Sequence, residues 1–326
     1  MLLELRASNA LTEYLRNQGW LGADEAISAV EKPGEGNMNF VARIITNRRP
    51  FIVKQALPWV HRFPQVAAPV ARGEMEATFY RLIEDQPTLK AYTPGLIGFD
   101  AHHHVLALED LGSGADFTFL YHAAGQLTQD QLHQLVGFLS ALHRVKAKPH
   151  EAQLFQNVAM RQLNHEHIFR YPFSEDNGMD LDGVIPGLQA AALPYKRDSS
   201  LKKRITALGD LYLQAGDTLV HGDYYPGSWL RVGAQVKVID PEFGFFGHAE
   251  FDVGVMLAHA LLTGGSLYTF EQVLALYEPT EGWHEPLAKS FAGVEMLRRL
   301  LGLAQLPLKQ TLEERIALLE QAITLL

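Results

Sequence analysis

The stretch HGDYYPGSWL, residues 221–230, carries an acidic residue in a turn-forming setting, and a second one follows in the segment VKVIDPEFGFFG. Asp223 stands five positions before Ser228, and Asp240 follows Ser228 by twelve positions at the end of an apolar run. Two carboxylates placed in this way can do different chemistry. One can accept or orient the proton of a hydroxyl group, and the other can bind a metal ion.

This spacing matches the catalytic loop and the metal-binding aspartate of kinases. In that layout Asp223 orients the attacking hydroxyl, Asp240 binds the magnesium ion that bridges the nucleotide phosphates, and Ser228 supplies a second metal ligand. The alternative is a structural turn, in which Asp223 caps a helix or His221 fills a core position. Because Asp240 follows at the expected distance, we favour ATP-dependent phosphoryl transfer.

Phosphoryl transfer also requires groups that hold the phosphates, and two segments near the N-terminus offer them. The loop GEGNMN, Gly34–Asn39, has small residues that let backbone N–H groups approach phosphate, although a simple hairpin turn would look similar. Lys54 follows an apolar run, where an unpaired ammonium would be costly, so we expect anionic partners. Glu76 is the preferred carboxylate; Glu74 lies about 200 degrees around the same helix and remains the alternative.

The segment LALEDLG, residues 106–112, ends an apolar strand with two carboxylates and a glycine. This pattern suits a hinge between two lobes whose main chain hydrogen-bonds adenine. An exposed strand end would give the same pattern, so the hinge is a hypothesis.

The elements that must position these residues change in character along the chain. Short segments rich in β-branched residues predict strands in the first third, followed by one helix and a further strand. Helical patterns dominate after residue 111, with Thr128 and Thr311 as expected N-caps and two short strands around the Gly233 turn. The predicted strands are 27–32, 39–46, 50–55, 104–108, 228–232 and 236–239, and the predicted helices are 70–85, 128–145, 201–214, 251–263, 285–303 and 311–325.

Composition bounds the class of protein. The chain has 326 residues, 47% of them hydrophobic, which is enough for two lobes with a substantial core. A net charge of −9 without any basic run argues against nucleic acid or a membrane surface as partner. There is no cysteine, and the N-terminal segment predicts a charged amphipathic helix rather than a signal peptide, so we expect a cytoplasmic protein.

The motifs also support a family resemblance. HGDYYPGS and IDPE resemble the HGDxxxxN and IDxE motifs of the aminoglycoside phosphotransferase and choline kinase superfamily. Within it the chain is most similar to the methylthioribose kinases, through GEGNMN, VKQALP, LEDL, HGDYYPGS and IDPEFGFFGHAEFDVG. FAGVEMLRRLLGLAQ, residues 291–305, is similar to the helix whose paired arginines hold the sugar in that family. Ser228 in place of asparagine marks this branch.

The resemblance implies a role for each matching position. The fold would be α+β and two-lobed like a protein kinase, with a small N-terminal nucleotide-binding lobe of antiparallel sheet and helix (1–109) and a larger, mainly helical catalytic and substrate-binding lobe (110–326). A homodimer is also implied. The implied nucleotide ligands are Asn37 and Lys54, the adenine contacts are Glu109 and Leu111, the metal-side residues are Asp240 and Glu242, and the substrate contacts are Asp223 with Arg298 or Arg299. Glu76, as the expected partner of Lys54, and Ser228, as the second metal ligand of the kinase layout, complete the candidate site.

On the residues alone, the two arginines point about 100 degrees apart on a helix, so we expect one to enter a cleft while the other faces solvent or a carboxylate. An exposed pair is the alternative. Arginines favour a polyhydroxyl or anionic acceptor over a cationic one.

The sequence therefore predicts a kinase that uses ATP and Mg²⁺ to phosphorylate a hydroxyl of a small molecule, with methylthioribose or a related pentose favoured. Another alcohol, of the aminoglycoside, choline, ethanolamine or hexose type, is the leading alternative. A nucleotide-binding module without turnover is a third hypothesis, because a fold does not guarantee chemistry.

Other polar features are interpreted as structural. The run His102–His104 cannot converge on one ion because successive side chains of an extended segment alternate in direction. The acidic segment 176–182 lacks the spacing of a calcium loop. His143 is expected to satisfy a buried group, and Asp252 is expected to cap the apolar helix and brace the catalytic loop.

Overall fold

The computed structural model describes residues 3–34, 38–122, 127–146, 148–264 and 268–326. The chain forms two compact units: the first contains Met1–Gly114 and Lys237–Phe243, and the second contains Ala115–Val236 and Gly244–Leu326. The prediction divided the chain after residue 109. The structure divides it after Gly114 and returns a short later segment to the first unit, so a single cut does not separate the two.

A five-stranded sheet in the order β1-β2-β3-β7-β6 forms the centre of the first unit. Neighbouring strands pair antiparallel, and β3 occupies the middle. The elements of this unit are α1 (Asn9–Asn17), β1 (Ile27–Glu31), β2 (Phe40–Thr46), β3 (Pro50–Gln55), β4 (Trp59–Val60), β5 (Phe63–Ala67), α2 (Arg72–Leu82), α3 (Pro87–Lys90), β6 (Leu96–Asp100) and β7 (Val105–Glu109).

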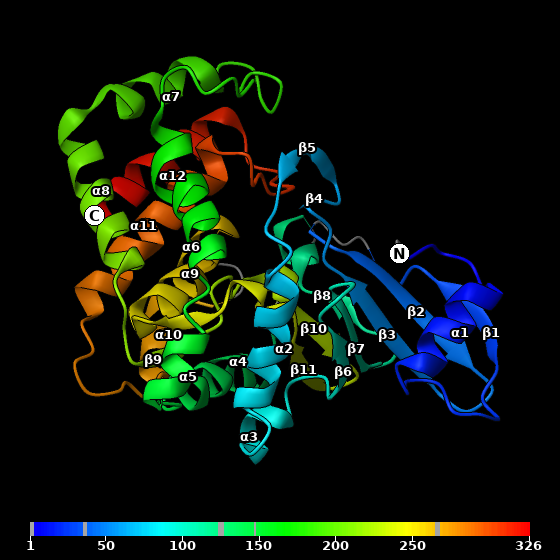
Figure 1. The fold of residues 1–326 in the computed structure, drawn as a ribbon. Coiled ribbons are helices and arrows are strands. Elements are labelled where there is room, and N and C mark those ends of the chain that lie inside the picture. The colour runs from blue at the N-terminus through cyan, green and yellow to red at the C-terminus, as the bar shows by residue number, and fades with distance from the viewer. Residues whose placement is uncertain (1–2, 35–37, 123–126, 147, 265–267) are drawn as a thin grey trace. The chain divides into compact units, whose positions relative to one another are not determined.

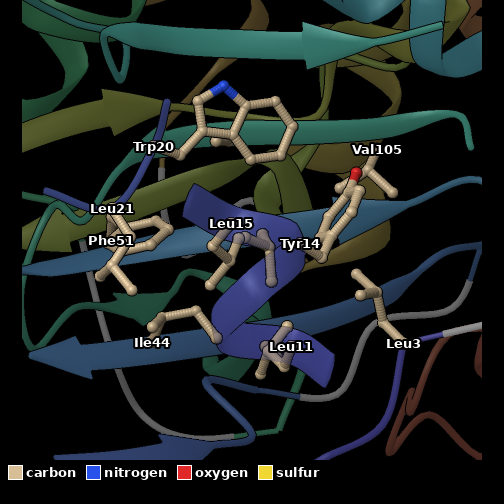
Figure 2. Packing of buried hydrophobic residues seen from close by; sticks show 12 residues of the cluster. Leu3, Leu11, Tyr14, Leu15, Trp20, Leu21, Ile44, Phe51 and Val105 are labelled. Atoms are coloured by element: carbon tan, nitrogen blue, oxygen red, sulfur yellow. The ribbon is translucent and has the colours of Figure 1, made fainter. Parts of the chain in front are cut away.

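Helix α1 covers one face of this sheet (Figures 1 and 2). Ser8 caps the helix by accepting a hydrogen bond from the N–H of Leu11, so the chain leaves the cap with Leu11 and Leu15 on one side. Figure 2 shows these two side chains pointing toward Ile44 and Phe51 of the sheet, with Tyr14 beside them, and all five are buried. The apolar face fixes the strands that carry the candidate residues.

The second unit is mainly helical. Its elements are β8 (Ala115–Asp116), η1 (Thr118–Tyr121), α4 (Gln129–Leu142), α5 (Pro149–Leu154), α6 (Val158–His165), the π-helical turn η2 (Glu166–Arg170), η3 (Tyr171–Phe173), α7 (Leu188–Arg197), α8 (Ser199–Leu213), β9 (Thr218–Val220), η4 (Pro226–Ser228), β10 (Trp229–Val232), β12 (Phe245–Gly247), α9 (Ala249–Leu262), α10 (Phe270–Leu276), α11 (Glu285–Leu301) and α12 (Leu312–Leu325). Strand β11 (Gln235–Val238) carries the chain into the first unit, where η5 (Pro241–Phe243) follows.

Helix α11 packs closely against both α9 and α12 in the second unit (Figure 1). Two glycines permit the approach. A Cβ on Gly254 would lie 2.7 Å from the carbonyl oxygen of Ala288, and one on Gly293 would lie 2.6 Å from that of Ala322. Helix α9 is buried on nearly every side, as its continuous apolar run predicts.

Most of the predicted elements are confirmed. Thr128 and Thr311 cap α4 and α12 as expected, each in a capping box. The prediction missed strand β6 and the hairpin β4–β5, because these segments are short or lack a regular alternation of apolar residues. It also missed helices α5, α6, α7 and α10. Among the described residues, no helix has the length and apolar character needed to cross a membrane.

Candidate active site

Lys54 lies on the central strand of the first unit. It is paired across the sheet with Val41 of β2 and Leu106 of β7, and its side chain is 6% exposed. Its Nζ lies 2.7 Å from Oε2 of Glu76 on α2 and 2.7 Å from Oδ1 of Asp240. The predicted pair with Glu76 is therefore present, and Glu74 is not its partner.

The ionisation of this cluster reflects strong mutual interactions. Burial alone would lower the pKa of Lys54, but the carboxylates of Asp240, Glu76 and Glu242 outweigh it and raise the pKa of the ammonium above its ordinary value. Burial, together with repulsion from Asp240 and Glu242, raises the pKa of Glu76 to about 7 despite the attraction of Lys54. The lysine is thus held as a cation.

Asp240 follows β11 in a left-handed backbone conformation, with φ of 63°. Aspartate tolerates this region better than most residues, and the conformation directs the side chain toward Lys54. The side chain is 50% exposed, so it retains access to solvent while contacting the ammonium. A half-exposed carboxylate fits a hydrated Mg²⁺, which binds proteins through one or two carboxylates and keeps several waters.

Glu242, the other predicted metal-side residue, is in a different environment. Its Oε2 accepts a hydrogen bond of 2.7 Å from Nδ2 of Asn39 and lies 3.5 Å from Nε of Arg72. Arg72 is fully buried, and its guanidinium also donates to the carbonyl oxygens of Met38, Leu57 and Pro69. Glu242 thus takes part in a network that holds Met38 and Asn39, the last two residues of GEGNMN. Asn37 lies outside the described residues.

The predicted hinge begins where β7 ends. The N–H of Glu109 donates to the carbonyl oxygen of Gly95 at 2.8 Å, and the N–H of Gly95 donates to Oε2 of Glu109 at 3.0 Å. Arg43 holds Asp110 through an ion pair of 2.9 Å. Leu111 is half-buried in the next position. The segment is well supported, and its contact with adenine stays a prediction.

In the second unit the HGD loop connects β9 to η4. The N–H groups of His221 and Gly222 both donate to the carboxylate of Asp252, at 2.6 and 2.9 Å. Asp252 lies in the first turn of α9, whose N-cap is His248, so the prediction that Asp252 caps this helix is wrong. Its carboxylate binds the loop instead, which confirms the expected brace. His143 is also structural: it is fully buried between Tyr277 and Asp252.

Ser228 supports the position of Asp223. Its hydroxyl donates a 2.9 Å hydrogen bond to the main-chain carbonyl oxygen of Asp223, five residues earlier. Gly227 lies under the ring of Tyr225, where a Cβ would come within 2.4 Å of Cζ. The loop is therefore a tight turn, and the hydroxyl of Ser228 closes it. Its predicted role as a metal ligand stays a prediction.

Both arginines of α11 converge on Asp223. Nη2 of Arg298 lies 3.2 Å and Nη2 of Arg299 lies 3.3 Å from Oδ1 of Asp223, whose side chain is 23% exposed. Neither arginine faces solvent, because both are buried, and both contact carboxylates rather than one of them alone. The reason is Glu295, which lies three and four residues earlier on the same helical face and binds Nε of each guanidinium.

A histidine and two tyrosines complete the surroundings of Glu295. Nε2 of His259 lies 3.2 Å from Oε1 of Glu295, and Nδ1 lies 2.6 Å from the hydroxyl of Tyr121. The guanidinium of Arg299 lies over the ring of Tyr225, with Cζ of Arg299 4.5 Å from the ring centroid. Burial lowers the pKa of His259 to about 4, so the imidazole is neutral near pH 7.

Charge interactions fix the ionised forms in this cluster. Burial alone would raise the pKa of Glu295, but the guanidinium groups of Arg298 and Arg299 hold it well below its ordinary value. Burial would lower the pKa of Arg299, yet Glu295 and Asp223 raise it. Among the described residues, no group of three or more acidic or histidine side chains is arranged to hold a metal ion by itself.

Comparison with known proteins places the chain in a family. Residues 30–287, most of the chain, match the phosphotransferase enzyme family. The chain belongs to this family. Its members' activity, transfer of a phosphoryl group, agrees with the cluster around Lys54 and the HGD loop.

The similar members of the phosphotransferase family include curated proteins named methylthioribose kinase. One from Exiguobacterium sibiricum is 28% identical over 90% of this chain and 84% of its own length. One from Pectobacterium carotovorum is 29% identical over 78% of this chain, but the match takes in 65% of the relative. Part of the second relative thus has no counterpart in the alignment.

Among solved structures, a choline kinase from Streptococcus pneumoniae has the same fold. Its TM-score with this chain is 0.52, at 14% identity over 98% of this chain and 99% of that one. This likeness confirms the kinase-like α+β fold that the motifs predict.

Sequence reasoning missed three residues of this phosphotransferase: Arg72, Glu295 and His259. A signal for Glu295 was present, since a glutamate three and four positions before two arginines predicts helical ion pairs. His259 interrupts an apolar helix and could have been recognised as a buried polar group. Arg72 gave no signal, because most of its partners lie far from it in the sequence, at Met38, Asn39, Leu57 and Glu242.

Proposed function

We propose that this protein is a kinase that uses ATP and Mg²⁺ to phosphorylate a hydroxyl group of a small sugar, with methylthioribose or a related pentose as the acceptor. The observation that carries the proposal is that Arg298 and Arg299 both contact Asp223. Asp223 lies in a loop whose main-chain N–H groups donate hydrogen bonds to Asp252. The names of the relatives support the choice of sugar.

On the nucleotide side, Lys54 supplies a permanent positive charge for phosphate oxygens, and Glu76 keeps it in place at 2.7 Å. Asp240 is the residue that would hold magnesium, because its carboxylate is half-exposed. When bound, the metal neutralises charge on the phosphates. Glu242 contributes by holding Asn39 and Arg72, and Arg72 in turn holds Met38, so the two residues directly before β2 are fixed.

On the acceptor side, Asp223 receives the proton of the attacking hydroxyl or orients that hydroxyl toward the phosphorus. Ser228 and Asp252 keep the loop rigid, so the carboxylate is positioned before the acceptor arrives. The two guanidinium groups present planar donors that suit the hydroxyl oxygens of a sugar. They disfavour a cationic acceptor of the choline or aminoglycoside type.

The test is ATP consumption measured against a panel of alcohols: methylthioribose, D-ribose, a hexose, choline and an aminoglycoside. We expect turnover with a pentose, and a loss of about 10²–10⁴-fold in kcat for Asp223→Asn, which preserves shape but removes the carboxylate. Asp176→Asn, in an exposed loop, is the matched control and should leave kcat unchanged.

Turnover of choline or the aminoglycoside, with no turnover of any pentose, would contradict the proposed acceptor. Bound ATP without turnover of any member of the panel would instead support a nucleotide-binding module.

A further inference from the structure

Glu295 occupies the centre of a buried cluster whose charges balance. The side chains of Glu295, Arg298 and Arg299 are 2%, 7% and 6% exposed, and Asp223 completes the group. Two guanidinium cations therefore face two carboxylate anions. Within the second unit, the neighbouring ionisable groups are His259, His167, Tyr121, Tyr212 and Tyr225.

These neighbouring groups do not change the net charge of the cluster near pH 7. Burial lowers the pKa of His259 to about 4 and also lowers the pKa of His167, so both imidazoles are neutral. Burial raises the pKa of Tyr121 and Tyr212, so these phenols keep their protons. If Glu295 were uncharged, the two arginines would outweigh Asp223 by one positive charge.

The geometry shows how one carboxylate controls both arginines. Oε1 of Glu295 lies 2.7 Å from Nε of Arg299 and 3.2 Å from Nε2 of His259. Oε2 binds Nε of Arg298. Because Glu295 holds the Nε of each guanidinium group, the terminal Nη2 atom of each is the one that contacts Asp223. Glu295 thus sets both the direction and the net charge of the groups beside the candidate catalytic carboxylate.

We propose that Glu295 is the residue that determines which charge class of acceptor this site takes: it cancels one arginine charge, so that a neutral polyhydroxyl acceptor is preferred over one bearing a phosphate or carboxylate. This inference rests on the proposed function, since it places the acceptor beside Asp223. Paired arginines without such a glutamate form a site for anions.

The experiment compares the binding of two probes, D-ribose and D-ribose 5-phosphate, in the absence of ATP by ligand-observed NMR. The wild type should prefer D-ribose. In Glu295→Gln the affinity ratio should shift by about tenfold or more toward the phosphorylated probe, because one surplus positive charge lies within a few ångströms of it in a partly desolvated site. Glu295→Asp, which keeps the charge, should retain the wild-type preference.

Two further variants separate specificity from folding. Glu295→Gln combined with Arg299→Gln restores the charge balance, so its preference should return toward D-ribose even if the single variant folds poorly. A purely structural role predicts that this double variant behaves no better than the single one. Glu250→Gln is the control for a buried glutamate outside the cluster, where Glu250 accepts a 2.8 Å hydrogen bond from the N–H of His284.

The outcomes distinguish the two proposals. If the wild type binds neither probe, this inference fails, and turnover of a pentose in the ATP-consumption panel then decides the proposed function separately. If the wild type binds D-ribose and the ratio is the same in folded Glu295→Gln, the inference alone is overturned.

Discussion

The Lys54 cluster of the first unit and the Glu295 cluster of the second unit combine carboxylates with basic groups, but in different proportions. Around Lys54, the carboxylates of Glu76, Asp240 and Glu242 face the ammonium and Arg72, so anionic groups outnumber cationic ones. Around Glu295, two carboxylates face two guanidinium groups. A surplus of carboxylates suits a site that works with a metal cation, whereas a balanced cluster suits a neutral ligand.

The two clusters also differ in how the chain builds them. Lys54, Glu76 and Asp240 come from a strand, a helix and a later loop, so the first cluster depends on tertiary packing. Glu295 and the two arginines lie on one face of α11, so most of the second cluster is set by helical geometry. The first should therefore be more sensitive to the loss of one member.

The largest effect is expected for Lys54→Met. Removing the ammonium leaves Glu76 buried without its cationic partner, which should lower the free energy of unfolding by about 3–5 kcal/mol. The free energies of unfolding of Lys54→Met and of the double variant Lys54→Met/Glu76→Leu are measured by urea unfolding and compared. The double variant should recover most of the loss, because no buried charge is left unpaired. Equal stability of the single and double variants would show that the pair is not the cause.

An intermediate effect on stability is expected when the pH is lowered, because of the buried imidazole of His259. The folded protein keeps this imidazole neutral down to about pH 4, whereas an unperturbed histidine has a pKa of 6.5. The unfolded chain therefore binds a proton that the folded chain excludes, so stability falls as pH is lowered through this window, by up to roughly 3 kcal/mol. Unfolding measured between pH 7 and pH 4 should show a shallower fall in His259→Gln. An unchanged slope would assign the acid sensitivity to other groups.

The smallest effect is expected at Glu285, which pairs with Lys289 on the same helix as Glu295. This pair has the same spacing as Glu295 and Arg299, but its side chains are 45% and 39% exposed. Water screens the attraction, so Glu285→Gln should cost only about 0.3–0.5 kcal/mol. A loss well above 1 kcal/mol in thermal or urea unfolding would mean that burial is not what separates the two pairs.

The sequence predicted the parts of the molecule that depend on local pattern. The strands around Lys54, the helices capped by Thr128 and Thr311, and the spacing of Asp223 and Asp240 are all local signals, and the family match supports the fold that they imply. The pairing of Lys54 with Glu76 was also accessible, because a buried ammonium needs an anion.

The remaining features depend on contacts that no local pattern encodes. Arg72 binds Met38, Asn39 and Leu57, which lie 34, 33 and 15 residues away along the chain. The arginines of α11 were expected to diverge because they differ by about 100 degrees around the helix. Their side chains are long enough for the terminal nitrogens to meet at Asp223, which is 75 and 76 residues away along the chain.

The return of Lys237–Phe243 to the first unit has a consequence for synthesis of the protein on the ribosome. The strands of this unit emerge early, but Asp240 becomes available only after much of the second unit has been translated. Domains generally fold as units during synthesis. Until then Lys54 has Glu76 but not Asp240, so the nascent first unit holds an incomplete charge cluster and finishes folding late.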